Sequence, residues 1–164
     1  MALSENESAL AGYQASMNLW IYEGNILWSK FNALLVANSV VLTAYGFTAG
    51  SGAVVGAFAW ALPIAGIVLC LLWAQLMRRG FDNYRYWIYS ARELEEKHLS
   101  PTTKLVSRGG DYADGSAVSL TIGGAQKPMQ IPKPGRLLTA AKGSYLVILT
   151  FLALWVILGL DSVI

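Results

Sequence analysis

One long uncharged stretch constrains this chain more than any other feature. The 47 residues from Phe31 to Met77 contain no Asp, Glu, Lys, Arg or His. As a single helix the stretch would extend about 70 Å, more than twice the roughly 30 Å of a bilayer's hydrocarbon core. It must therefore fold back on itself, and we expect the reversal at Gly50-Ser51-Gly52, because glycine turns without steric cost.

The sequence predicts three membrane spans. The uncharged stretch supplies two, at about Phe31–Ala49 and Ala53–Met77, and the apolar stretch Ser144–Leu160 supplies a third. The third is short, but Lys142 can snorkel at one end and Asp161 marks the other. Composition agrees, because 55% of the residues are hydrophobic and only 13% are charged, about half the charged fraction of a soluble domain.

The basic residues lie on one side of these spans. Eleven of the 12 Lys and Arg residues lie between Arg78 and Lys142, and Lys30 precedes the first span. By the positive-inside rule the N-terminus and residues 78–143 are therefore expected in the cytoplasm, with the glycine-rich reversal and the C-terminal Ile164 outside.

Charge and cysteine content exclude several function classes. The net charge of +2 is too small to favour nucleic acid, and the single Cys70 excludes an internal disulfide, a Cys-rich zinc site and an iron–sulfur cluster. A metal site needs three or four convergent ligands, so we interpret His98 as a solvated residue at a helix end. No nucleophile elbow or other catalytic signature accompanies the Ser, Asp and His residues. The sequence predicts no enzyme, no metal and no cofactor.

Four segments follow from these patterns. Residues 1–30 are expected to form an amphipathic cytoplasmic helix, and residues 31–77 a transmembrane helical hairpin. Residues 78–143 are expected to hold a cytoplasmic helix extension and a Gly/Pro-rich hairpin segment, and residues 144–164 the third transmembrane helix. The predicted fold class is an all-α integral membrane protein with three transmembrane helices, a cytoplasmic helical stem and a small β-hairpin segment.

The two cytoplasmic helices have recognisable ends. Ser4 and Glu7 have capping-box spacing and predict a helix start, followed by apolar residues at helical intervals and a break near Gly24: Leu10, Tyr13, Met17 and Trp20. This apolar face either lies on the membrane surface or packs on the other cytoplasmic helix. The second span is expected to continue past Met77 and to end at Ser100-Pro101. Three arginines at the headgroup level either contact anionic lipid or only set the topology: Arg78, Arg79 and Arg85.

Glycines and prolines break up the segment that follows. Val118–Ile122 alternates with period two, and residues 129–131 are its expected partner across a turn at Gly123-Gly124, so residues 118–131 predict a β-hairpin. A two-stranded hairpin is marginal in water, so it needs a partner surface. We interpret Gly109-Gly110-Asp111 as a turn, because no strand precedes it.

The second span carries a row of small residues at helical spacing: Gly52, Gly56, Ala59, Pro63, Gly66 and Cys70. Small faces let membrane helices approach closely, so we interpret the row as a helix-packing seam. It packs either within one subunit or between subunits.

The first span carries a polar face. Asn32, Ser39 and Thr43 lie on one side of the helix with Gly46 and Gly50, and Asn38 lies beside them. Polar groups inside a bilayer face protein or water rather than lipid. This face therefore either bonds to a neighbouring helix or lines a pore.

Four stretches resemble one family of membrane proteins: WSKFN at 28–32, LLVAN at 34–38, PIAGIVLCLLW at 63–73 and SARELE at 90–95. Over about residues 10–100 the chain resembles the RipA-like octameric inner-membrane proteins of bacteria. The resemblance implies a bacterial cytoplasmic membrane protein that forms a homo-oligomer such as an octamer, with a role in envelope or stress physiology. It implies no catalytic residues. Residues 107–135 and the third span have no counterpart in it.

Two function hypotheses remain. The first is a non-enzymatic homo-oligomeric assembly protein of the bacterial cytoplasmic membrane, either a scaffold or a pore, with membrane lipid and its own copies as partners. The alternative is a small accessory subunit of a larger hetero-oligomeric membrane complex.

Overall fold

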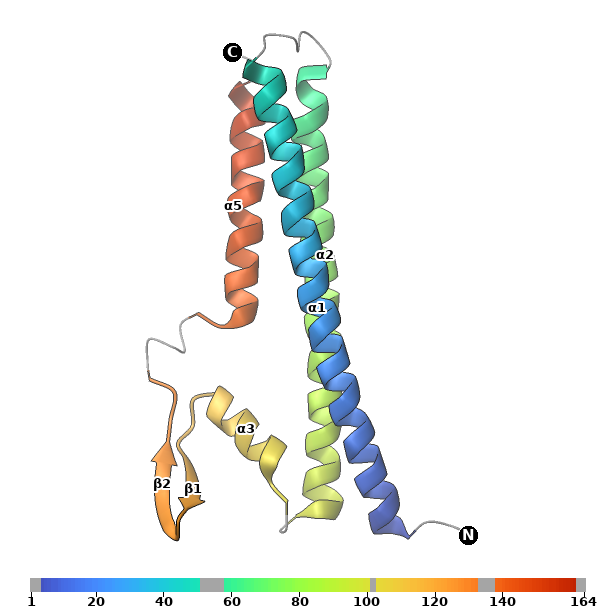
Figure 1. The fold of residues 1–164 in the computed structure, drawn as a ribbon, viewed down its shortest axis with the longest axis vertical. Helices are drawn as coiled ribbons and strands as arrows, with labels where there is room; N and C mark the ends of the chain where they lie inside the picture. The colour runs from blue at the N-terminus through green and yellow to red at the C-terminus, as the bar shows by residue number, and fades with distance from the viewer. Residues whose placement is uncertain (1–3, 51–57, 101–102, 133–137, 162–164) are drawn as a thin grey trace. The chain divides into compact units, whose positions relative to one another are not determined.

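A computed structural model describes residues 4–50, 58–100, 103–132 and 138–161 (Figure 1). Its elements are α1 (Glu5–Gly50), α2 (Phe58–Leu94), the π-helical turn η1 (Glu95–Leu99), α3 (Leu105–Ala113), β1 (Val118–Ile122), β2 (Ala125–Met129) and α5 (Ala140–Asp161). Three of them, α1, α2 and α5, are long and apolar enough to cross a membrane. The predicted fold class, three spanning helices with a small β-hairpin, is confirmed.

The chain divides into two compact units. The span unit consists of Asn25–Phe81 and Ala140–Ile164, and the hairpin unit consists of Met1–Gly24 and Asp82–Thr139. Both α1 and α2 therefore contribute one part to each unit. The reversal expected at Gly50-Ser51-Gly52 falls largely on residues 51–57, which lie outside the described residues.

The span unit is built around a small apolar core. Its buried members come from all three helices: Leu27, Cys70, Trp73, Met77, Ile148 and Trp155. Large apolar side chains also face outward, among them Val40 of α1, Leu72 of α2 and Leu149 of α5. A bundle that is apolar inside and outside suits a hydrocarbon surrounding rather than water.

The N-terminal helix begins as predicted. The Ser4 N–H donates to Glu7 Oε2 at 2.8 Å, and the Glu7 N–H donates to Ser4 Oγ at 3.4 Å, so the two residues form the capping box. The break expected near Gly24 is wrong, because α1 is continuous from Glu5 to Gly50. A Cβ at residue 24 would lie 3.3 Å from Tyr84 Cε2. Glycine therefore allows a close approach to α2 here rather than a bend.

Within the hairpin unit, the buried positions of α1 and α2 are occupied by small residues. Ala9 and Ser16 of α1 are buried, as is Ala91 of α2. The larger apolar residues at helical intervals lie to the side: the Trp20 ring packs 5.2 Å from that of Tyr84, whereas Leu10 is exposed. Small side chains let the two helices approach closely, which accounts for this choice of face.

The β-hairpin forms with its turn at the predicted position. Gly123 and Gly124 have φ of +61° and +80°, as a two-residue type I′ turn requires. This tight turn places Ala125 opposite Ile122 and Met129 opposite Val118. The partner strand is therefore β2, 125–129, rather than the expected 129–131.

The prediction of a turn at Gly109-Gly110-Asp111 is wrong, because all three residues lie in α3. A Cβ at residue 110 would lie 2.4 Å from an Arg92 guanidinium nitrogen, so a larger residue there would have to displace the end of the Arg92 side chain. The two successive glycines therefore lie inside a helix and do not break it.

Candidate functional site

One buried amide joins the three helices of the span unit. Asn38 of α1 is fully buried, and its Nδ2 donates to the Leu34 carbonyl at 3.0 Å. Its Oδ1 accepts from Trp155 Nε1 of α5 and from the Cys70 thiol of α2, both at 3.3 Å. Asn38 was predicted to lie beside a polar face that either bonds to a neighbouring helix or lines a pore, and the structure places it in the core, where it bonds to α2 and α5 of the same chain.

The structure describes four of the six small residues in the row predicted on the second span. Gly66 packs directly against the Trp155 ring, because a Cβ there would lie 2.2 Å from Trp155 Cε2. Pro63 is buried opposite Gly159 of α5, and Cys70 is buried against Asn38. These three residues pack within the chain. Ala59 lies in α2, while Gly52 and Gly56 lie outside the described residues.

The other polar residues of the first span lie on the surface. Asn32, Ser39 and Thr43 are all exposed, and we call these three residues the polar strip of α1. The Ser39 hydroxyl donates to the Leu35 carbonyl at 2.9 Å, and the Thr43 hydroxyl donates to the Ser39 carbonyl at 2.8 Å. The structure therefore brings Asn38 to the core and leaves the polar strip on the outside of the span unit.

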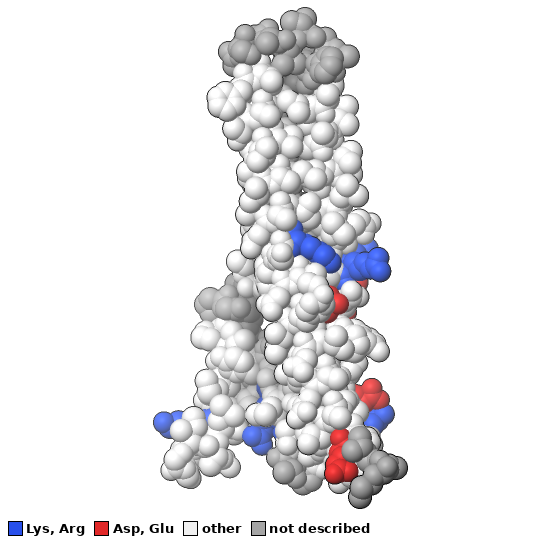
Figure 2. All heavy atoms as spheres, turned by 45° about the vertical axis from the view of Figure 1, so that its right-hand side comes forward, with Lys and Arg blue, Asp and Glu red and all other residues white. Residues whose placement is uncertain are grey.

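Basic residues gather at one level of the span unit. Leu27 packs on Gly80, and the Phe31 ring lies 5.1 Å from the Trp73 ring, so Lys30 of α1 lies within about one helical turn of the level of Arg78 and Arg79 of α2. On the face drawn in Figure 2, Lys and Arg side chains form a band across the helices. No charged residue is visible between this band and the grey residues at the top of the view. Arg78, Arg79 and Arg85 are all exposed, and Arg85 belongs to the hairpin unit.

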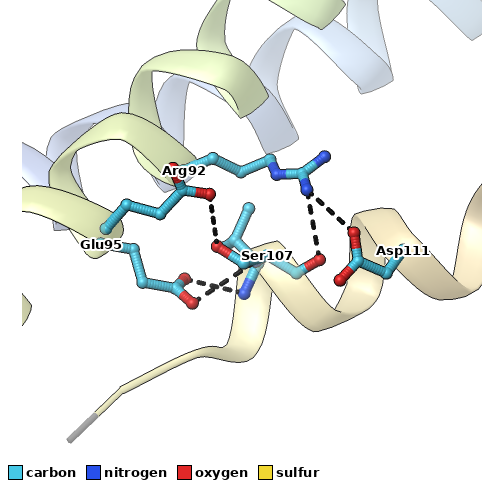
Figure 3. A network of polar contacts seen from close by, with 6 residues as sticks. Arg92, Glu95, Ser107 and Asp111 are labelled. Carbon is cyan, nitrogen blue, oxygen red and sulfur yellow. Dashed lines mark hydrogen bonds and ion pairs between the residues drawn. The ribbon is translucent and has the colours of Figure 1, made fainter. Parts of the chain in front are cut away.

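A second buried polar group holds α3 in the hairpin unit (Figure 3). Glu95 of η1 is fully buried, and its carboxylate accepts the Val106 N–H at 2.9 Å and the Ser107 N–H at 3.4 Å. These N–H groups belong to the first turn of α3, which has no capping side chain of its own, so Glu95 supplies the cap from another element. Burial raises the pKa of Tyr13, and the nearby Glu95 carboxylate raises it further.

An arginine binds the same helix further along. The Arg92 Nη2 donates to the Ser107 carbonyl at 3.5 Å and to Asp111 Oδ1 at 3.2 Å (Figure 3). Sequence reasoning missed both Glu95 and Arg92, because they lie in a charged run that is typical of a solvated helix. One signal in the sequence could have shown that Glu95 is buried. Ala91 is a small, buried residue four positions earlier, so the two residues lie on the same face of the helix.

The single histidine lies at the end of the stem helix. His98 is part of η1 and is partly exposed, with its Nδ1 3.5 Å from Glu5 Oε1. In the part of the chain that the structure describes, no three His, Cys, Asp or Glu side chains gather as metal ligands would.

Comparison with known proteins identifies one family. The model of the octameric membrane protein family matches residues 13–164, which include the Gly-rich segment and the third span. No curated protein and no solved structure matches the chain. The family expected from residues 10–100 is confirmed, and the match extends over the parts that had no counterpart in the resemblance.

Proposed function

The chain belongs to the octameric membrane protein family, and from this premise we propose that it builds a non-enzymatic homo-oligomeric assembly that acts as a scaffold or a pore. Its place is the bacterial cytoplasmic membrane. The buried polar groups support a structural role, because Asn38 joins three spanning helices and Glu95 caps α3.

The polar strip of α1 is the observation that carries this proposal. Asn32, Ser39 and Thr43 are exposed in the single chain, while the outward side chains around them are apolar, including Val36, Val40 and Phe47. An amide has four hydrogen-bonding positions, and a hydroxyl that donates to its own helix still has acceptor capacity. In hydrocarbon this capacity is unmet, so the strip favours contact with another copy or with a water-filled pore.

The charge distribution supports one orientation. We place the level of Lys30, Arg78 and Arg79 at the cytoplasmic face, with the hairpin unit inside, because basic residues accumulate on that side. A cysteine introduced at Ser51 in a Cys70→Ala background is expected to react with a membrane-impermeant maleimide from outside the cell. Labelling that occurs only after lysis would contradict this orientation and indicate the opposite one.

The mass of the purified assembly tests the proposal. Expressed alone and extracted in mild detergent, the chain is expected to give one defined species in native mass spectrometry, a multiple of the 17.7 kDa chain, with eight copies as the family's number. No second protein is needed for it. A monomer under these conditions, or assembly only together with a stoichiometric second protein, would overturn the proposal and favour the accessory-subunit hypothesis.

A further inference from the structure

The outer side of α2 carries an amide that the fold does not use. Gln75 lies two residues from buried Trp73 and two from buried Met77, so its side chain points away from the core of the span unit. It is exposed and makes no hydrogen bond within the described residues, and the same holds for Asn32 of the polar strip of α1. A carboxamide has two donors and a carbonyl acceptor, and inside a membrane these need partners from protein or water.

The two amides lie at the same depth. Within the span unit α1 and α2 run in opposite directions (Figure 1), and Leu27 of α1 packs on Gly80 of α2. Asn32 comes five residues after Leu27, and Gln75 comes five residues before Gly80. Because both helices rise by about 1.5 Å per residue, both amides are displaced by the same distance, in the same direction, from that contact.

The same correspondence extends along the outer sides of both helices. Residues seven apart lie about two turns apart on one side of a helix. We call Asn32, Ser39 and Gly46 the α1 row, and Ala61, Val68 and Gln75 the α2 row; all six residues are exposed. By the same count Ser39 lies at the depth of Val68, and Gly46 at the depth of Ala61. A Cβ at Gly46 would meet nothing within 4 Å in its own chain, so this glycine leaves room for a neighbour.

A closed ring of copies brings two different surfaces of the chain together. Copies that cross the membrane in one orientation are related by rotation about the membrane normal, so neighbours in a ring make heterologous contacts. Such a rotation does not change depth. Groups that meet across the interface must therefore lie at equal depth within one chain, and the α1 row and the α2 row meet this condition.

We propose that the α1 row of one copy packs on the α2 row of the next copy, with the amides of Asn32 and Gln75 hydrogen-bonded to each other. This inference rests on the proposed homo-oligomer, and of the two surroundings open to the polar strip it selects contact with another copy. Two carboxamides are complementary, because each has an N–H donor for the carbonyl oxygen of the other. Glycine opposite alanine at the other end of the rows lets the helices approach closely.

Disulfide cross-linking of the full chain in membranes tests this contact. In a Cys70→Ala background, Ser39→Cys with Val68→Cys keeps both amides and gives each chain one thiol for each neighbour. Mild oxidation is expected to produce a ladder of multimers that ends at the octamer on a non-reducing gel. The matched control, Ser39→Cys with Ala61→Cys, moves the second thiol seven residues, about 10 Å, along the same side of α2. This exceeds the reach of a disulfide, so the control should give no ladder.

The outcomes separate this contact from the proposed function. Equal ladders from both pairs would overturn the contact. So would the absence of a ladder from the test pair while native mass spectrometry still finds one defined assembly, and in both cases the proposed function would stand. A parent chain that is monomeric would overturn both.

Leucine at the two amide positions tests the hydrogen bond separately. Asn32→Leu or Gln75→Leu alone leaves one amide without its partner. Each is expected to raise the concentration at which half of the assembly dissociates by about threefold, the effect of an average hydrogen bond between membrane helices. The double variant is expected to dissociate at no higher concentration than either single variant, as measured by native mass spectrometry of a dilution series. Additive effects of the two substitutions, or no effect of either, would overturn the inference.

Discussion

Gly66→Ala is expected to destabilise the span unit by about 2–4 kcal/mol, although it adds one methyl group. The new Cβ would lie 2.2 Å from Trp155 Cε2 and 2.3 Å from Trp155 Cδ2, so the indole must move. Overpacking of a core costs about 1–3 kcal/mol, and moving the ring also breaks its bond to Asn38, which adds about 0.5–1.5 kcal/mol. The measurement is the unfolding midpoint in sodium dodecyl sulfate, followed by tryptophan fluorescence.

Gly143→Ala is the matched control for this change. It makes the same substitution in α5, at a residue where a Cβ would meet nothing within 4 Å. Because alanine favours the helix by up to about 1 kcal/mol, its stability should equal or exceed that of the parent chain. Both variants are compared at one protein concentration, since assembly adds concentration-dependent stability. Equal midpoints for the two variants would contradict the close contact of Gly66 with Trp155.

Asn38→Leu is expected to lower the unfolding free energy by about 1–3 kcal/mol. Leucine has a similar branched shape, but it leaves the Trp155 N–H and the Cys70 thiol buried without the acceptor they share. Hydrogen bonds between membrane helices average about 0.6 kcal/mol in double-mutant cycles. We therefore expect the loss of unfolding free energy to lie in the lower part of this range. The same unfolding experiment measures the effect.

Ser39→Ala is the control on the next residue. The Ser39 hydroxyl is exposed and bonds only to its own helix, so its removal should change the unfolding free energy of the single chain by no more than about 0.5 kcal/mol. A double-mutant cycle of Asn38→Leu with Trp155→Phe is expected to show coupling of about 0.5–1.5 kcal/mol. Additive effects would mean that the Asn38–Trp155 bond does not stabilise the span unit.

Periodic and compositional signals predicted much of the fold. The uncharged run and the apolar stretch at 144–160 predicted three long helices, and the structure has them in α1, α2 and α5. Ser4 with Glu7 predicted the start of α1, and Gly123-Gly124 predicted the hairpin turn. These signals are local, because each depends on residues within a few positions or on the thickness of a bilayer.

The errors and omissions came from contacts between distant residues. A Cβ at Gly24 would press against Tyr84, and one at Gly110 would meet the end of the Arg92 side chain. Glu95 looked like a surface charge, yet it caps a helix eleven residues later in the chain. A single sequence does not show which helix packs on which, so it does not separate a glycine that bends a helix from one that admits a neighbour.

The same limit applied to the polar residues of the first span. Asn38 and Ser39 are adjacent in sequence, but the structure buries the first against Trp155 and exposes the second. Helical spacing predicted a polar face that either bonds to a neighbouring helix or lines a pore, and it did not show which residue does which: Asn38 bonds to α2 and α5, whereas Ser39 bonds to its own helix. The polar strip of α1 remains exposed in the single chain, and the proposed assembly has to supply the partners for its polar groups.

The accessibility of residue 39 in a lipid bilayer tests this account most directly. A nitroxide is attached to Ser39→Cys, with Leu149→Cys on the apolar exterior of α5 as the control, both in a Cys70→Ala background. Collision rates are measured by electron paramagnetic resonance with oxygen, which concentrates in hydrocarbon, and with a nickel chelate, which stays in water. We predict that residue 39 collides with oxygen much less often than residue 149 does. Low collision rates with both reagents would indicate a packed scaffold, and frequent collisions with nickel would indicate a pore. An oxygen collision rate at residue 39 equal to that at residue 149 would place the polar strip in lipid and contradict the proposed assembly.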